Sequence, residues 1–486
     1  MASREIFKIK NNILEKYRGR AKNVMVPDGV TAIDSFAFEG NQNITNVNIP
    51  NSVKYIDDYA FTACDNLKSV ILSDSIRRIG KGVFSWCTEL ENINIPDNIG
   101  GIWESAFFCC SSLTKINIPA NVTYIGEDAF AHCEKLESIT VSENNKEYMD
   151  IDGNLYNKDG KTLIQYAMGK KEETFRVPDE VTKIEPRAFS KSKNLKEIII
   201  SDNLTDIGLD AFLWCADLVK ITILKNNPKY KDIDGNIYTK DGKKLIRYAI
   251  GKKEETFRIP NGVTDIEEAA FRNCCNLKTI SIPDSVQRIG ENAFAHCNNL
   301  ESIIIPSSVI TVGKNAFQYC SELTSISLPN GITNIEAGTF HQCLKLANVK
   351  IPDTVKNIGG SAFQACKSLE KINIPDAVTG IGNMTFAWCE KLTDIAIPES
   401  VANIGWGAFE NCNNLTNIII PDNITTICSA TFKNCTNLTS IVIPQSVTNI
   451  APDAFENCNN LTIYTNEGSY AKKYTRRKKI KLEVIK

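Results

Sequence analysis

A 23-residue unit repeats through most of this chain, and no other feature limits the fold as strongly. Its consensus is I-P-x-x-V-x-x-I-G-x-x-A-F-x-x-C-x-x-L-x-x-I-x, in which positions are counted from the proline as zero. Phenylalanine stands at position +11 in all 16 copies, from Phe38 to Phe455. Self-similarity at a fixed period of this length indicates stacked coils, each of which contacts only its neighbours. The sequence therefore predicts a solenoid rather than a globule, which favours a binding function.

Each unit encodes two short extended segments joined by turns. The closing L-x-x-I-x-I stretch alternates apolar and polar residues, which is the pattern of a half-buried strand. Proline then ends the strand because it has no N–H to donate, and pairs such as Asp-Ser or Asn-Gly favour a turn. We expect V-x-x-I to form a second extended segment on the opposite side of the coil and A-F-x-x-C to form a tight return turn. The predicted class is a repeat solenoid of parallel strands, mostly β and turns.

Fourteen of the 17 cysteines occupy one repeat position, +14, where Asn41 and Ser192 stand in the other two copies. A position that accepts Cys, Asn and Ser requires a small side chain, and a buried free cysteine behaves as a small hydrophobe. Stacked coils would point these thiols in the same direction, which suits a disulfide poorly. No C-x-x-C pair is present. We therefore expect a column of buried reduced thiols and no metal site.

Two longer islands interrupt the period, at residues 143–177 and 225–259, and they are identical at 25 of 35 positions. Asp-Gly between strand-forming residues indicates a hairpin, so we predict two β-strands in each island, joined at Asp159–Gly160 or Asp241–Gly242.

The D-I-D-G-N stretch of each island opens like a calcium-binding loop. In the first island, however, Leu155 stands where such a loop needs glycine, and Lys161 stands where it needs glutamate. The second island departs from the pattern in the same way. We expect turns at these stretches rather than calcium binding.

The two ends of the chain differ from the repeats, as capping segments do. We predict a capping hairpin at residues 1–26, a solenoid at 27–466 and a cap of one helix and one strand at 467–486. The basic run K-K-Y-T-R-R-K-K near the C-terminus is compatible with a nucleic-acid patch, but such a run is more often the solvated face of a helix. We expect no nucleic-acid partner.

The overall charge gives no indication of an oppositely charged partner. The formal net charge is −2, with 55 basic and 57 acidic residues, so no global field points to nucleic acid, a membrane or an acidic substrate. No run of 18 apolar residues occurs, which argues against membrane insertion. Residues 1–26 contain no apolar stretch of the kind found in signal peptides, so no signal peptide is visible. A processed form would look the same.

The repeat consensus, the D-G-N-x-Y-x-K-D-G-K islands and the closing G-S-Y-A-K-K-Y segment together resemble BspA-like leucine-rich repeat proteins. The resemblance covers nearly the whole chain. It implies a right-handed parallel solenoid that bacteria and some protozoa use mostly as secreted or surface-attached adhesins for host proteins. A cell-surface or secreted location is therefore expected, although the lack of a visible signal peptide leaves the cytoplasm open.

Few residues suited to catalysis are present. The only histidines are His132, His296 and His341, and no H-E-x-x-H, Walker A, G-x-S-x-G or paired Cys–His arrangement occurs. The resemblance brings no fixed catalytic residues. We expect no enzymatic activity and no cofactor; an enzyme would need a pocket closed by the islands with clustered carboxylates.

Position +13 varies in size while its neighbours stay fixed, so we predict that it faces solvent. Large aromatic residues are typical anchors of protein interfaces. Trp86, Cys109 and His132 occupy this position in three consecutive coils, and we expect them to form one patch beside Phe108. Neutral surface variation is the alternative. The candidate binding residues of this kind are Trp86, Phe108, His132, Trp214, His296, Tyr319 and Trp388.

Positions +19 and +21, on the face of the predicted strand, are mainly Asn, Ser, Thr and Lys. Asn94, Asn117 and Asn373 are the further candidate contacts here. This lining is able to hydrogen-bond a protein or a glycan, or it only keeps the chain soluble. The leading hypothesis is a monomeric, non-enzymatic scaffold that binds a protein partner. The alternatives are a passive structural or spacer surface protein and a glycan-binding surface protein.

Overall fold

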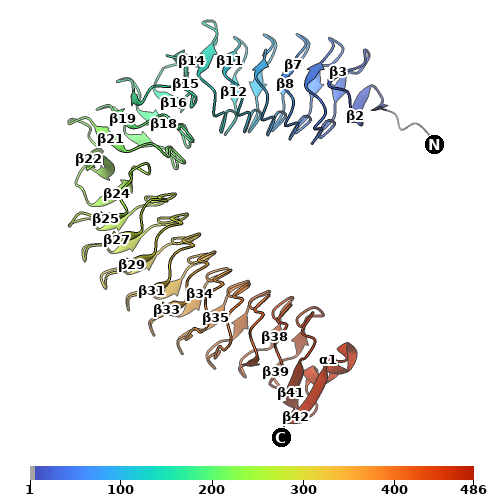
Figure 1. The fold of residues 1–486 in the computed structure, drawn as a ribbon, viewed down its shortest axis with the longest axis vertical. Helices are drawn as coiled ribbons and strands as arrows, with labels where there is room; N and C mark the ends of the chain where they lie inside the picture. The colour runs from blue at the N-terminus through green and yellow to red at the C-terminus, as the bar shows by residue number, and fades with distance from the viewer. Residues whose placement is uncertain (1–5, 486) are drawn as a thin grey trace. The chain divides into compact units, whose positions relative to one another are not determined.

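The computed structural model describes residues 6–485, so the outermost residues of both predicted caps lie outside the described residues. The chain divides into two compact units, unit 1 (Met1–Tyr230) and unit 2 (Lys231–Lys486), and each is described separately. Within each unit, consecutive coils lie side by side (Figure 1). This arrangement confirms the predicted solenoid.

The L-x-x-I-x-I stretches form one stack of parallel strands in each unit. Equivalent residues of successive coils pair directly, as Asn46 does with Ser69. The strands of unit 1 are β3 (Asn23–Met25), β5 (Asn46–Asn48), β7 (Ser69–Ile71), β9 (Asn92–Ile93), β11 (Lys115–Ile118), β13 (Ser138–Val141), β17 (Thr174–Arg176), β19 (Glu197–Ile200) and β21 (Lys220–Ile223). Those of unit 2 are β25 (Thr256–Arg258), β27 (Thr279–Ser281), β29 (Ser302–Ile304), β31 (Ser325–Ser327), β33 (Asn348–Lys350), β37 (Asn417–Ile419), β39 (Ser440–Val442) and β41 (Thr462–Asn466).

The V-x-x-I stretches form a second stack of parallel strands, each two residues long, as predicted. In unit 1 these are β4 (Ala32–Ile33), β6 (Tyr55–Ile56), β8 (Arg78–Ile79), β10 (Gly101–Ile102), β12 (Tyr124–Ile125), β18 (Lys183–Ile184) and β20 (Asp206–Ile207). In unit 2 they are β26 (Asp265–Ile266), β28 (Arg288–Ile289), β30 (Thr311–Val312), β32 (Asn334–Ile335), β34 (Asn357–Ile358), β35 (Gly380–Ile381), β36 (Asn403–Ile404), β38 (Thr426–Ile427) and β40 (Asn449–Ile450).

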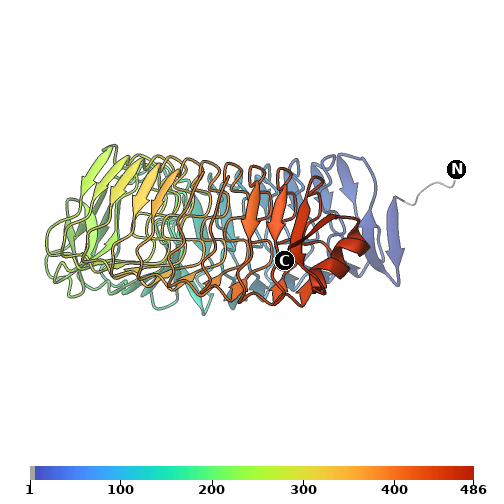
Figure 2. The ribbon, with the colours of Figure 1, turned by 90° about the horizontal axis from the view of Figure 1, so that it is seen from below.

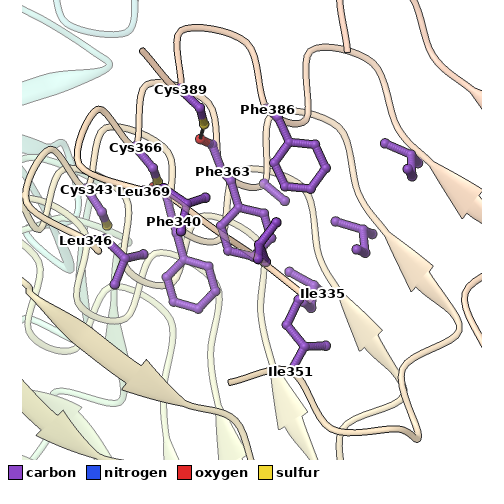
Figure 3. Packing of buried hydrophobic residues seen from close by; sticks show 14 of the residues in the cluster. Ile335, Phe340, Cys343, Leu346, Ile351, Phe363, Cys366, Leu369, Phe386 and Cys389 are labelled. Atoms are coloured by element: carbon purple, nitrogen blue, oxygen red, sulfur yellow. Dashed lines mark hydrogen bonds between the residues drawn. The ribbon is translucent and has the colours of Figure 1, made fainter. Parts of the chain in front are cut away.

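The core of each unit contains a ladder of phenylalanine rings. Phe340, Phe363 and Phe386 stand in a row in Figure 3, with ring centroids 5.3 and 5.6 Å apart and planes tilted by 18° and 3°. All three side chains are fully buried. Stacked aromatic pairs contribute about 0.5–1.5 kcal/mol beyond the area that they bury. Neighbouring coils are thus held together by contacts that no single coil can make.

A column of thiols runs beside the phenylalanine ladder. In thirteen coils the Sγ of the +14 cysteine donates to the backbone carbonyl of the +11 phenylalanine in the preceding coil, as from Cys366 to Phe340 at 3.2 Å. All fourteen +14 cysteines are free and buried. Burial raises the pKa of the Cys366 thiol, and that of the Cys389 thiol to about 12. The predicted column of buried reduced thiols is confirmed.

The return turn has a feature that the sequence did not predict. The residue at +13 has a positive φ in all 16 copies, between 55° at Ala63 and 67° at Asn273. Left-handed backbone costs an L-residue about 1–2 kcal/mol, and asparagine and glycine tolerate it best. Gly40, Asn411 and Asn434 suit this turn, whereas bulky tryptophans at the same position do not.

Each island contains more strands than the two predicted. In the first island β14 (Tyr148–Ile151), β15 (Asn154–Asn157) and β16 (Thr162–Gln165) form an antiparallel meander. The predicted Asp159–Gly160 turn joins β15 to β16, but Asp152–Gly153 also turns the chain, with φ of 49° and 71°. The D-I-D-G-N stretch is therefore a hairpin turn. The second island has the strands β22 (Tyr230–Ile233), β23 (Asn236–Thr239) and β24 (Lys244–Arg247).

The islands and the N-terminal segment each begin a new ring ladder with a tyrosine. Tyr166 donates its backbone N–H to Ala188 at 2.9 Å and places its ring 5.1 Å from Phe189. Tyr248 does the same at 5.3 Å from Phe271. In the predicted N-terminal cap, β1 (Phe7–Lys10) and β2 (Ile13–Tyr17) form an antiparallel hairpin, and Tyr17 stacks on Phe38 at 5.1 Å.

The last coil of unit 2 is covered by α1 (Tyr470–Lys478) and β42 (Lys481–Ile485), both drawn in red in Figure 2. Tyr474 meets the Phe455 ring edge-on, with centroids 6.0 Å apart. β42 pairs in parallel with β41 and so extends the strand stack by one. The basic residues of α1 are mostly on its outer side, since Ala471, Tyr474 and Thr475 are its buried residues.

Alkylation of the native protein with iodoacetamide at mildly alkaline pH should modify Cys275 first. Cys275 is exposed and open to the reagent, whereas the +14 thiols are buried. Burial also raises the pKa of Cys275, so accessibility decides the order. Peptide mapping by mass spectrometry reports the order of modification. In denaturant all cysteines should react at similar rates; rapid modification of several +14 cysteines in the native state would contradict the buried column.

Replacing Ala365 by glycine should stabilise unit 2. Ala365 has a φ of 58°, and removing its Cβ relieves the left-handed cost by about 0.5–1 kcal/mol after the entropy that glycine loses on folding. The free energy of unfolding in urea measures the change. Ala362→Gly, at the buried +10 position without a positive φ, is the matched control and should destabilise the protein.

Candidate functional site

The predicted patch around Trp86 is a contiguous aromatic cluster in unit 1. The Trp86 and Phe108 rings meet edge-to-face with centroids 5.9 Å apart, and Phe108 lies 4.8 Å from His132. Trp86 is 52% exposed, and Phe108 and His132 are half-buried. These three residues form the aromatic cluster. Its side chains come from three consecutive coils, at positions +13, +12 and +13.

Cys109 lies beneath this cluster, with its Sγ 3.6 Å from Nδ1 of His132. The sequence showed no paired Cys–His motif, because the two residues lie one coil apart. Burial raises the pKa of the Cys109 thiol and lowers that of His132 to about 4. Both groups are therefore neutral near pH 7. A neutral thiol is a poor nucleophile, so this pair supports packing rather than catalysis.

The solvent-facing prediction for position +13 is right for the tryptophans and wrong for Cys109 and Ala365. Trp86, Trp214 and Trp388 are 52%, 47% and 44% exposed. Cys109 and Ala365 are only 6% and 5% exposed. Size alone does not decide exposure, because Gly40 is exposed and Asn411 is buried at the same position. All three tryptophans of the column are nevertheless exposed.

The column continues beyond the first island through Lys191, which the sequence did not single out. Its Nζ lies 5.8 Å from the centroid of the Trp214 ring and 3.3 Å from a carboxylate oxygen of Glu134. Lys193 also pairs with Glu134, at 2.6 Å. The Lys191 cation is thus held over an exposed aromatic ring, a contact worth about 0.5–1 kcal/mol at such sites.

Unit 2 carries a second group of rings on the same column. His296 stacks on Tyr319 with centroids 4.4 Å apart, and Tyr319 meets His341 edge-on at 5.6 Å. The sequence did not join His341 to this group because it stands at +12. Phe108 also stands at +12 and was assigned to the first patch, so its position indicated that a +12 ring can join rings at +13. Within residues 6–485 no other ring stacks on Trp388.

Another aromatic surface of unit 1 was only partly foreseen. Trp103 packs against Tyr124 at 5.2 Å, and the Arg78 guanidinium lies 5.3 Å from the Trp103 ring. The exposed Phe36 stacks on Tyr59 at 5.4 Å. These residues stand at positions +5, +7 and +9. Aromatic residues do not recur regularly at these positions, so only the geometry of the coils shows that these residues form pairs.

The strand-face candidates line two shallow depressions. Asn94 and Asn117 lie in a depression of about 590 Å³ in unit 1, and Asn373 lies in one of about 350 Å³ in unit 2. The lining is less polar than predicted, because Ile71 and Ile304 on this face are 58% and 81% exposed. Backbone pairing fixes the +21 side chains on the outer face whether they are polar or apolar.

Two kinds of feature are absent from the described part of the chain. Residues 6–485 contain no group of three or more His, Cys, Asp or Glu side chains placed to hold a metal ion. Over the same residues, no helix combines the length and apolar character that crossing a membrane requires.

Comparison with known proteins gives consistent results. A family model described as BspA type leucine rich repeat region matches residues 8–137, 166–242, 250–370 and 358–472. A leucine rich cell surface protein from Faecalibacterium prausnitzii is 27% identical, over 90% of this chain and 92% of its own, with a TM-score of 0.40. A leucine-rich repeat protein from Bacteroides ovatus is 27% identical, over 85% and 90%, with a TM-score of 0.34. The pneumococcal vaccine antigen PcpA is 18% identical, over 99% and 96%, with a TM-score of 0.42. No curated protein matches the chain.

The stability of the protein should fall on acidification in part because of His132. Burial, followed by the Lys191 charge, lowers its pKa from 6.5 to about 4, so between these values the unfolded chain binds more protons. Stability therefore rises with pH across this window. His132→Asn should lose less stability than the wild type between about pH 6.5 and 4 in urea titrations. Trp388→Asn, at the same repeat position and in the other unit, is the control and should leave the pH dependence unchanged.

Proposed function

Because the chain belongs to the BspA-type leucine-rich repeat family, we propose that it is a non-enzymatic scaffold that captures a protein partner, at the cell surface or after secretion. The similar protein from Faecalibacterium prausnitzii is described as a cell surface protein, which supports this location. The aromatic cluster of Trp86, Phe108 and His132 is the proposed contact surface.

The observation that carries the proposal is the exposed tryptophan of the cluster in a left-handed turn. Trp86 has a φ of 62° and is 52% exposed. A bulky side chain at such a backbone costs stability, and the same position accepts Asn434 elsewhere in the chain. Trp214 and Trp388 share this backbone and a similar exposure, but within the described residues only Trp86 of the three stacks on another ring, and this combination favours a contact with a partner.

The cluster is also suited to binding because its rings are held in place. Phe108 contacts Trp86 on one side and His132 on the other, so the rings lose little freedom when a partner arrives. Tryptophan is among the residues that most often dominate the energy of protein interfaces. A passive spacer, the alternative, does not require exposed rings that are stacked on one another.

Glycan binding is the second candidate function, and the strand face favours it. Asn94, Asn117 and Lys115 bring amide and ammonium groups together in one depression of unit 1. Asn46 and Ser69 on the same face hydrogen-bond each other at 2.7 Å, so part of this lining is already satisfied. We therefore place the protein partner first.

The test is a triple variant, Trp86→Asn, Phe108→Ser and His132→Asn, in which each new residue already occurs at that position in another coil. Partner capture should weaken by tenfold or more, since interface anchors contribute about 2 kcal/mol or more each. Affinity capture with quantitative mass spectrometry compares the variant with the wild type, and the unfolding midpoint should be unchanged or higher.

Trp388→Asn is the matched control for this test, because Trp388 is exposed on the same column without a stacked neighbour. It should keep full capture. If the triple variant captures the same partners as strongly as the wild type, the aromatic cluster is not the contact surface. If only sugars compete with capture, the glycan hypothesis replaces it.

A further inference from the structure

The first island leaves a cavity of about 430 Å³ in unit 1. It lies where the island replaces a regular coil, between the end of β12 and the turn after β18, both of which are labelled in Figure 1. Phe130 ends one ring ladder here and Tyr166 begins the next. The residues that line the cavity include Glu127, Asp128, Leu155, Ile164, Gln165 and Arg187.

The cavity has an apolar floor and a negatively charged rim. Leu155 is fully buried, and Ile164 packs against the same core. The charged lining residues are Glu127, Asp128 and Glu185, with Arg187 as the cation. Three carboxylates facing one guanidinium leave the rim with an excess of negative charge.

The existing ion pairs do not use all of these carboxylate oxygens. Arg187 Nη1 donates to Asp128 Oδ2 at 2.5 Å and to Glu127 Oε1 at 3.3 Å. Glu185 Oε1 pairs with Lys183, which is outside the lining, at 2.8 Å. Within the described residues Asp128 Oδ1 accepts no hydrogen bond. Acceptors therefore remain at the rim.

Gln165 supplies a further acceptor from within the cavity wall. Its side chain is only 8% exposed, and Nε2 donates to the carbonyls of Tyr166 at 2.9 Å and Ala188 at 3.0 Å. Both of those partners are acceptors, so they fix which end of the amide is the nitrogen. Within residues 6–485 the Oε1 atom accepts no hydrogen bond. Because Gln165 lines the cavity, this oxygen is open to a donor that enters it.

The second island has a different residue at this place. Arg247 stands there in unit 2 and donates to the carbonyl of Ala269, whose counterpart in the first island is Arg187 rather than Ala188. The two islands therefore use this place differently. Only the first island has a side-chain carbonyl acceptor here.

We propose that this cavity binds a small primary amine with an apolar body. The ammonium group donates to Gln165 Oε1 and to the carboxylate of Asp128, and the apolar body lies on Leu155 and Ile164. Acceptors without donors and the excess of carboxylates select a cation, and the buried floor selects an apolar group beside it. The site is separate from the aromatic cluster and does not depend on the proposed function.

Benzylamine, a cation at neutral pH, is the probe, with benzyl alcohol and benzoate as shape-matched neutral and anionic compounds. Saturation-transfer NMR and calorimetry on the full chain should give a dissociation constant of about 1 mM for benzylamine. Benzyl alcohol should bind at least tenfold more weakly, and benzoate should not bind. Absence of saturable benzylamine binding, or equal binding of the alcohol, overturns the proposal.

Gln165→Arg is the decisive variant, because it removes the Oε1 acceptor and copies Arg247, which stands at this place in the second island. It should weaken benzylamine binding at least tenfold without lowering the unfolding midpoint. Arg187→Asn removes the cation that competes for Asp128, and asparagine occupies the same repeat position at Asn292 and Asn315. This variant should tighten binding at least threefold. Unchanged affinity in either folded variant overturns the proposal.

Discussion

The contact between one coil and the next is the interaction on which the rest of the structure depends. A phenylalanine ring lies on its counterpart, as Phe363 does on Phe386 at 5.6 Å, and a thiol donates to the neighbouring carbonyl, as Cys389 does to Phe363 at 3.2 Å. A coil alone has no partner for either group. Stability in such arrays is the sum of many nearest-neighbour terms. An interruption therefore has to restart the ladder, and Tyr166 does so after the first island.

The parts of the fold that the sequence predicted are those in which every copy agrees. Phe363 and Cys366 are identified by recurrence alone, because burial at these positions permits one kind of side chain. The left-handed turn was not predictable, because Trp86, His132 and Ala365 share one backbone conformation and no chemical property. The strand at Tyr148–Ile151 was missed because its four residues show no apolar alternation, with all of them half-buried.

The candidate site was predictable only as far as coil neighbours could be counted. Trp86, Phe108 and His132 were joined because stacking places equivalent positions side by side. Contacts across the island were not predicted. The pairing of Lys191 with Glu134, for example, spans 57 residues, which is not a multiple of the repeat length. The cavity beside Gln165 was hidden for the same reason. It exists because a regular coil is replaced there, and periodicity describes only the regular coils.

The left-handed turn at position +13 has a consequence for how such a surface diverges. Because the backbone penalty falls on nearly every side chain other than glycine and asparagine, exchanging one bulky residue for another changes the displayed chemistry while the cost of the turn stays nearly constant. The contacts of the +11 phenylalanine and the +14 cysteine between coils stay the same when the +13 residue is exchanged. Single substitutions at position +13 can therefore change the binding specificity of the surface one coil at a time, while the scaffold stays the same.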